Sequence, residues 1–205
     1  SLAYVARVKE LLISNNKELK EENIEFKEIK TSGDLNLHKK ISEIGGKNLF
    51  CKEIEESLLS KEIDIAVHSL KDVTSIKTKG LRMECFLKRN DPQEVLINKE
   101  NLTLDEIKKN SVIGTSSLRR EFQLKHLRPD LNFKLIRGNI DTRIKKLDED
   151  QYDSIILAKA GLLSLSMEDR ISEVFECKKI VPPAGQGTIV IQSRDCLLYT
   201  SPSPR

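Results

Sequence analysis

Apolar residues recur along the chain in two patterns, one typical of strands and one typical of helices. Short apolar or alternating runs predict strands at residues 24–30, 63–70, 81–87, 94–98, 111–114, 132–137, 154–157 and 188–192. Helical spacing predicts helices at residues 2–14, 50–60, 104–109, 118–127, 140–147 and 167–175. The run IDIAVHSL at 63–70 is almost continuously apolar, which predicts a strand buried on both faces. This alternation of strands and helices favours an α/β fold.

Two polar segments with prolines interrupt the pattern and predict two domains. Residues 89–92 (RNDP) and 182–187 (PPAGQG) are interpreted as hinge segments. They would separate domain 1, residues 1–88 with 188–195, from domain 2, residues 93–181. Because the chain would cross twice between the domains, we expect a hinge with a cleft beside it.

Composition narrows the partners that the protein can have. The net charge is only +3, from 35 basic and 32 acidic residues, and aromatic residues make up 4%. We therefore expect no nucleic-acid partner. No apolar run approaches the roughly 18 residues of a membrane-spanning helix, so we expect no membrane partner either. The spacing of Cys51, Cys85, Cys177 and Cys196 matches no metal site and predicts reduced thiols in a cytoplasmic protein.

The last ten residues, 196–205 (CLLYTSPSPR), differ from the rest of the chain. They lose its Lys/Glu-rich character, and two prolines prevent them from extending a strand or helix. We interpret them as a non-native tail, translated from sequencing-adapter read-through. A disordered native terminus is the alternative.

Two early loops place a cation where a ligand could bind. GGKNLF at 45–50 combines glycines, which allow close backbone approach, with Lys47 and a helix start. HSLKD at 68–72 follows the apolar strand, and ligands of open α/β sheets lie beyond strand carboxyl ends. A solvated lysine in a helix-entry turn, and a solvated Lys71–Asp72 pair, are the alternatives. His68 is interpreted as a hydrogen-bonded core histidine.

Two later loops repeat this design. In GTSSLRR (114–120), Ser116 or Ser117 can cap the helix, and two arginines offer bidentate forks to carboxylates or phosphates. In RGNIDTR (137–143), an arginine ends the strand and Asn139 can cap the next helix. We therefore predict a small ligand with several negative charges. Neither a P-loop nor a G-x-G-x-x-G motif is present, so nucleotide binding is unsupported.

Six ordered motifs resemble the hydroxymethylbilane synthase (porphobilinogen deaminase) family. They are TSGD, GGKNLF, AVHSLKD, VIGTSSLRR, LIRGNIDTR and PAGQG, and the resemblance covers about residues 2–195. It implies two α/β domains like those of type II periplasmic binding proteins, joined by a double-crossover hinge. It also implies a monomer that joins four porphobilinogens head to tail with loss of ammonia, on a dipyrromethane cofactor that is thioether-linked to a cysteine.

The resemblance also implies roles for individual residues. Asp72 would be the catalytic carboxylate, which stabilises positive charge on the pyrroles and handles protons. The cofactor or chain carboxylates would be held by Ser69, Lys71, Thr115, Ser117, Arg119, Arg120 and Arg143. Incoming substrate would be bound by Arg137, Gly138, Asn139, Lys47 and Gln186, and Asp34 is a weaker candidate.

Some of the family pattern is not matched. We expect that the opening strand of domain 1 precedes Ser1 and is absent, as is the third, α+β domain with its cofactor cysteine after Asp195. None of the four cysteines takes that place, so we expect this chain to be inactive alone. Gln93-Glu94 replaces a more usual Arg-Asp pair.

Two further functions are compatible with the residues. A non-catalytic two-domain protein that binds a small polyanionic solute would share the hinge architecture. Nucleic-acid binding is a weaker third interpretation and would require strongly salt-dependent affinity.

Overall fold

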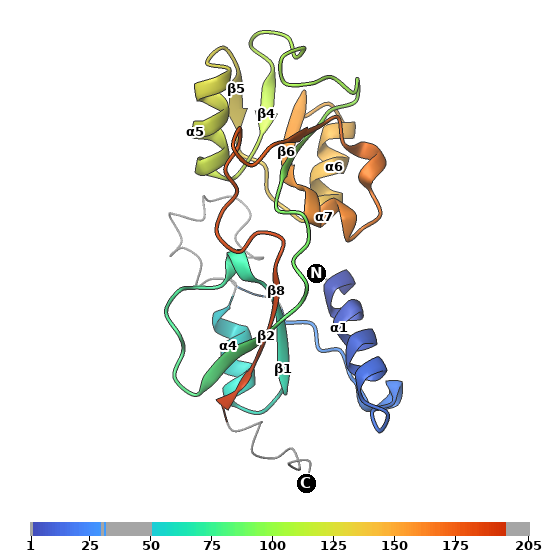
Figure 1. Cartoon of the computed structure of the whole chain (residues 1–205). Helices are drawn as coiled ribbons and strands as arrows, with labels where there is room; N and C mark the ends of the chain where they lie inside the picture. Colours follow the sequence, from blue (N-terminus) through green and yellow to red (C-terminus); the bar gives the residue numbers. More distant parts are fainter. Residues whose placement is uncertain (1, 30, 32–50, 196–205) are drawn as a thin grey trace. The chain divides into compact units, whose positions relative to one another are not determined.

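The computed structural model describes residues 2–29, 31 and 51–195. They fall into two compact units. Unit 1 contains residues 2–29, 31, 51–89 and 188–195, and unit 2 contains residues 90–187. Both units combine helices with a sheet, which confirms the predicted α/β class (Figure 1).

Unit 1 is built on a three-stranded antiparallel sheet of order β1-β8-β2. Its strands are β1 (Ile65–Ser69), β2 (Leu81–Phe86) and β8 (Ile189–Arg194). The α-helices are α1 (Leu2–Asn15) and α4 (Lys52–Leu59), and two 3-10 turns are η1 (Glu21–Asn23) and η3 (Leu70–Asp72). The central strand is the one that returns from the end of the sequence, so residues far apart in the chain complete this sheet.

One face of the unit 1 sheet carries its apolar core. Leu58 of α4 packs with Ala66 and Leu81, and a second cluster joins Cys51 to Val73 and Val190. Along β1, buried and half-buried residues alternate. The prediction that 63–70 is buried on both faces is therefore wrong, because in this antiparallel strand only alternate side chains are fully covered.

A series of hydrogen bonds between buried polar side chains links strands β1 and β8 to helix α4 in unit 1. The Gln192 Nε2 group donates to Glu55 Oε1 at 2.8 Å, so its Oε1 atom accepts from His68 Nε2 at 2.9 Å. The hydroxyl of Thr78 donates to Glu55 Oε2 at 2.7 Å. His68 is 7% exposed and is the hydrogen-bonded core histidine that the sequence predicted.

The buried histidine makes the stability of unit 1 depend on pH. Burial lowers the pKa of His68 below its ordinary value, against the opposing effects of Gln192, Glu55 and Asp72. The folded state therefore resists protonation that the unfolded chain accepts near pH 6.5. Unit 1 should lose stability as the pH falls through that value, by at most about 1.4 kcal/mol per pH unit. Urea midpoints at pH 7.5 and 5.5, followed through amide signals of β1 and β8, measure this loss in unit 1, and the loss should be smaller in His68→Gln. An unchanged pH dependence in that variant would contradict the assignment.

Unit 2 is built on a five-stranded mixed sheet of order β5-β4-β6-β3-β7. The strands are β3 (Glu94–Ile97), β4 (Val112–Gly114), β5 (Asn132–Lys134), β6 (Ser154–Ala158) and β7 (Glu173–Phe175). The helices are α5 (Leu118–Leu127), α6 (Ile140–Asp148), α7 (Lys159–Leu163) and the 3-10 turn η4 (Glu168–Arg170). β4 runs parallel to β5 and β6, whereas β3 is antiparallel to both of its neighbours.

Apolar clusters cover both faces of this sheet, and Figure 1 shows α5 on one side with α6 and α7 on the other. Adjacent residues of β6 divide between the clusters, since Ile155 packs with Ile144 of α6 whereas Ile156 packs with Leu124 of α5. All four residues of β3 are buried as well. The central strands are thus covered on both faces, which is typical of strands between two helix layers.

Three predicted elements are wrong. Residues 24–29 form no strand, because they pair with no other described strand and are mostly exposed. Residues 104–109 form only a turn, and Asn110 follows at a φ of 66° that an α-helix does not continue. The predicted helix at 167–175 is η4 followed by β7, because the edge of β3 is available for pairing and Phe175 becomes fully buried there.

Candidate functional site

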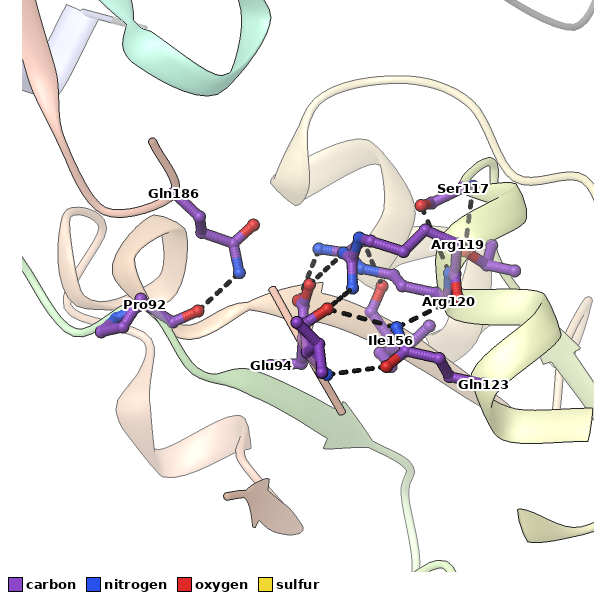
Figure 2. Close-up of polar contacts among 10 residues, drawn as sticks. Pro92, Glu94, Ser117, Arg119, Arg120, Gln123, Ile156 and Gln186 are labelled. Carbon is purple, nitrogen blue, oxygen red and sulfur yellow. Dashed lines mark hydrogen bonds and ion pairs between the residues drawn. The ribbon is translucent and has the colours of Figure 1, made fainter. Parts of the chain in front are cut away.

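The best-defined polar cluster of unit 2 joins one carboxylate to two arginines. Glu94, the first residue of β3, is fully buried. One of its carboxylate oxygens accepts from Arg120 Nη2 at 2.7 Å, and the other accepts from Arg119 Nη2 (Figure 2). We call Glu94, Arg119 and Arg120 the arginine–glutamate trio. It fixes both predicted ligand-binding arginines at the start of α5.

The loop before α5 is folded by its own hydroxyl groups. Thr115 Oγ1 accepts from the Ser117 amide at 3.1 Å, and Ser117 Oγ accepts from the Arg120 amide at 3.5 Å, which caps the helix. Thr115 is buried, at 4% exposure. The sequence left open whether Ser116 or Ser117 is the cap, and the structure assigns Ser117. Both hydroxyls therefore order the loop that presents the arginines.

Charge and burial act in opposite directions within the trio. Burial raises the pKa of Glu94, but the charges and donors of Arg120 and Arg119 outweigh it and hold that pKa below its ordinary value. Burial, together with the charge of Arg120, lowers the pKa of Arg119 and outweighs the opposing charge and hydrogen bond of Glu94. A guanidinium nevertheless stays protonated in proteins, so all three groups are charged at neutral pH. The trio therefore carries one net positive charge.

The two arginines differ in accessibility. The Arg119 side chain is 27% exposed, and its Nη1 donates to the Val181 carbonyl at 2.6 Å. The Arg120 side chain is 8% exposed, and its Nη1 donates to the Ile156 carbonyl at 3.0 Å. The Arg120 Nε atom is buried and has no hydrogen-bond partner in the described part of the chain. Arg119 is thus the arginine that can meet a ligand at the surface, while Arg120 lies behind it.

The 137–143 loop forms a second, separately ordered group. Asn139 Oδ1 accepts from the Thr142 amide at 2.9 Å and caps α6, as predicted. Gly138 has a φ of +112°, a conformation that favours glycine, and a Cβ there would come within 2.7 Å of the Thr142 side chain. The carbonyl of Gly138 accepts from Arg143 Nε at 2.8 Å. Arg137 is buried at 8% exposure.

The remaining predicted site residues lie in other places. Asp72 is exposed and is the last residue of η3. This turn begins directly after Ser69 and also contains the half-buried Lys71. The Leu70 amide donates to the Thr188 carbonyl at 2.9 Å and so fixes this turn in unit 1. Gln186 is in unit 2 at 1% exposure, and its Nε2 donates to the Pro92 carbonyl at 2.7 Å (Figure 2). The predicted site residues Lys47 and Asp34 lie outside the described residues.

Within unit 2 the structure thus brings together Thr115, Ser117, Arg119 and Arg120, and it orders Arg137, Gly138, Asn139 and Arg143 as a second group. Ser69, Lys71 and Asp72 share one turn of unit 1. Sequence reasoning noted Glu94 only as a departure from the family pattern. A carboxylate at the first position of an apolar strand, directly after a hinge, is the signal that could have identified it.

Among the described cysteines, Cys51 should be the unreactive one. It is 1% exposed, and burial, with smaller effects of Glu55 and Asp72, raises the pKa of its thiol from 9.0 to about 11. Cys85 and Cys177 are exposed. With iodoacetamide at pH 8, alkylation of Cys51 should be on the order of 100-fold slower than that of Cys85, because the thiolate is the nucleophile. Peptide mass mapping measures this difference, and comparable rates would contradict it.

The described residues contain neither a metal-binding cluster nor a membrane-spanning helix. No group of three or more His, Cys, Asp or Glu side chains is placed to hold a metal ion in this part of the chain. Within the same residues, no helix has both the length and the apolar character to cross a membrane.

The fold and the trio define an α/β protein with a cationic loop site suited to carboxylate or phosphate groups. Sequence comparison makes the class specific. Residues 1–197 match the family described as porphobilinogen deaminase, dipyromethane cofactor binding domain. The chain belongs to this family, whose cofactor is dipyrromethane. This finding confirms the resemblance seen in the six motifs and favours an enzyme over a non-catalytic solute-binding protein.

Sequence relatives support the same family assignment. The chain is 49% identical over 172 residues to the porphobilinogen deaminase of Bacillus subtilis (strain 168), a match covering 83% of this chain and 55% of the relative. It is 44% identical over 194 residues to that of Ehrlichia chaffeensis, covering 95% of this chain and 64% of the relative. The chain therefore spans a little over half the length of the curated relatives it matches.

Solved structures resemble this chain less closely than the sequence relatives do. One is a periplasmic sulfonate-binding protein from Methylobacillus flagellatus, with a TM-score of 0.44, 16% identity, and coverage of 73% of this chain and 48% of the other. Another is a ligand-binding component of an ABC-type import system from Staphylococcus aureus, with a TM-score of 0.44, 14% identity, and coverage of 73% and 54%.

Proposed function

We propose that the chain forms the cofactor- and substrate-binding part of a porphobilinogen deaminase, a transferase that joins porphobilinogen molecules head to tail. The observation that carries the proposal is the arginine–glutamate trio within a chain of this family. Each pyrrole of the ligand bears an acetate and a propionate. Arginine forks suit such carboxylates because they donate two parallel hydrogen bonds.

The residues present fit a cofactor that bears carboxylates. Arg120 keeps a buried Nε–H without a partner among the described residues, and the exposed edge of Arg119 lies on the same helix turn. An unsatisfied buried donor costs free energy that an incoming acceptor would recover. Ser117, Thr115 and Arg143 would complete the binding set. When bound, the dipyrromethane supplies the first pyrroles of the growing chain.

Asp72 is proposed as the catalytic carboxylate. In each condensation the C–N bond of the substrate aminomethyl group breaks and ammonia leaves. A C–C bond then forms to a pyrrole carbon, which loses its proton. Positive charge develops on the pyrrole between these events, and a carboxylate beside it stabilises that charge and can accept a proton. An exposed Asp72, in a turn fixed by the Leu70–Thr188 hydrogen bond, is free to do so.

The other assignments are parts of the same proposal. Lys71 and Ser69 would hold cofactor carboxylates, whereas Arg137, Gly138, Asn139, Lys47 and Gln186 would bind incoming porphobilinogen. Residues 1–88 with 188–195 would form one domain and 93–181 the other, joined at 89–92 and 182–187. The protein would be cytoplasmic and monomeric. Light scattering of the purified protein tests the monomeric state.

Binding of porphobilinogen to the 205-residue chain tests the proposal directly. Calorimetric titration should show a complex that weakens at least tenfold when Arg119 is replaced by Ala, because a charged hydrogen bond contributes about 1.5–3 kcal/mol. The matched control is Arg170→Ala, which removes an arginine of similar exposure, 30%, that is paired with Asp148. Absence of any porphobilinogen binding, or equal weakening by both substitutions, would contradict the proposal.

Covalent chemistry is tested separately by mass. We propose that this chain alone neither acquires a covalent two-pyrrole adduct nor forms product. Incubation with porphobilinogen followed by intact mass measurement should show the unmodified chain. A stable adduct, or linear tetrapyrrole in solution, would refute this part of the proposal and leave the binding result standing.

A further inference from the structure

Glu94 is held more firmly than either arginine that it contacts. Its backbone pairs with Ala158 of β6 on one side and with Phe175 of β7 on the other. Its side chain is fully buried, against 8% exposure for Arg120 and 27% for Arg119. A side chain that rises from a doubly paired strand is a fixed reference point, whereas long arginine side chains have many rotamers.

The arginines would not converge without a shared partner. Consecutive helix residues point about 100° apart around the axis, so Arg119 and Arg120 do not share a face of α5. Each nevertheless bonds a different oxygen of the same carboxylate. Each pairing uses one terminal nitrogen. Glu94 thus draws two divergent side chains to one point. The Nη1 group of each guanidinium donates to a backbone carbonyl, whereas the Arg120 Nε–H has no partner among the described residues.

The shared carboxylate also sets the charge of the site. Two arginines alone would present two positive charges that repel each other at close range. With Glu94 ionised, one positive charge remains, which matches a single carboxylate of the ligand. A buried charge that is paired on both oxygens is also less costly than one left unpaired.

We propose that Glu94 is a positioning residue, which orders Arg119 and Arg120 so that the trio receives one carboxylate of the pyrrole chain. This inference rests on the proposed function for the identity of the ligand. Glu94 acts through the arginines and does not itself touch the ligand. Both anionic oxygens are therefore decisive, because a glutamine at this position has the same length but only one oxygen that can accept from a guanidinium group.

The first arm of the test uses the 205-residue chain without ligand. Side-chain Nε–H signals of arginines are followed by ¹H–¹⁵N NMR and assigned with Arg119→Lys and Arg120→Lys variants. In the wild type, the Arg120 signal should be sharp and protected from solvent exchange, because the Nε atom is buried. In Glu94→Gln, exchange at one or both arginines should accelerate at least tenfold. Unchanged signals in Glu94→Gln overturn the inference, whatever the ligand is.

The second arm measures porphobilinogen affinity. Glu94→Gln should weaken binding about tenfold, the loss of roughly one charged hydrogen bond. In an Arg119→Lys background the same change should matter less than about twofold, because its effect passes through Arg119. A tenfold loss in both backgrounds, or tighter binding by Glu94→Gln, overturns the inference.

Glu173→Gln is the matched control. Glu173 is a partly buried carboxylate on the neighbouring strand β7, bonded to Lys179 at 3.1 Å and to the Leu104 amide at 2.6 Å. Within the described part of the chain, Glu173 forms no hydrogen bond or ion pair with the trio. Its variant should bind porphobilinogen like the wild type and keep the Arg120 Nε–H signal. If the wild type binds no porphobilinogen, the proposed function fails, while the ligand-free NMR arm still decides whether Glu94 orders the arginines.

Discussion

Replacement of Asp72 by Asn is expected to lower porphobilinogen turnover by about 10²- to 10⁴-fold, the range typical of a lost general acid–base group. The measurement uses the product of the complete reading frame that encodes this chain. Asn keeps the size and hydrogen-bonding ability of the side chain but carries no negative charge. Positive charge that develops on the pyrrole would then be uncompensated, and no carboxylate would accept a proton.

The fold should survive this substitution. Asp72 is exposed, and the turn is fixed by backbone contacts, including the Leu70–Thr188 bond at 2.9 Å. Thermal unfolding of Asp72→Asn should therefore match that of the wild type within the usual range for surface changes. Asp64→Asn is the control, since Asp64 is an exposed carboxylate of the same unit that bonds Arg194 at 2.6 Å. Substantial turnover by Asp72→Asn would refute the assigned role.

Replacement of Glu94 by Ala should destabilise unit 2 by about 3–5 kcal/mol, which is the usual cost of removing one partner from a buried ion pair. The buried Arg120 would keep its charge with no counterion, and Arg119 would have to turn toward solvent. Urea denaturation followed through amide signals of β3 and β6 measures the effect on this unit. The readout must be local because the chain contains two units.

Two comparisons identify the cause of this loss. Glu173→Ala removes a carboxylate that is 17% exposed and should cost only about 1 kcal/mol. Replacing Glu94 and Arg120 together by Met should recover part of the stability, because it removes the uncompensated charge and fills the space with apolar atoms. Equal losses for Glu94→Ala and Glu173→Ala, or no recovery in the double variant, would contradict a buried-charge mechanism.

Elements with strong local signals were predicted well. The helix at 118–127 has the same bounds in the structure, because Ser117 caps it and its own apolar spacing defines it. The strand at 94–98 is found as Glu94–Ile97, and 132–137 shortens to Asn132–Lys134. In contrast, α7 was missed, because five residues carry too few apolar positions to show a helical period.

Elements whose state depends on a distant partner were predicted badly. Residues 167–175 have helical spacing, yet Glu173–Phe175 adds a strand to the free edge of β3. Residues 24–29 alternate like a strand but meet no partner strand among those described. Periodicity reports the direction of side chains along a segment. It does not report which other segment is available to pair with it.

The candidate site divides in the same way. The sequence by itself determined the family and the Asn139 cap, because these depend on residue type and short spacing, and from the same features it predicted which residues bind anions. Only the tertiary structure decided that Arg120 is buried, that Arg119 is the accessible fork, and that Glu94 pairs with both. About 25 residues separate Glu94 from the arginines. Their meeting depends on how β3 packs beside α5, which no local pattern encodes.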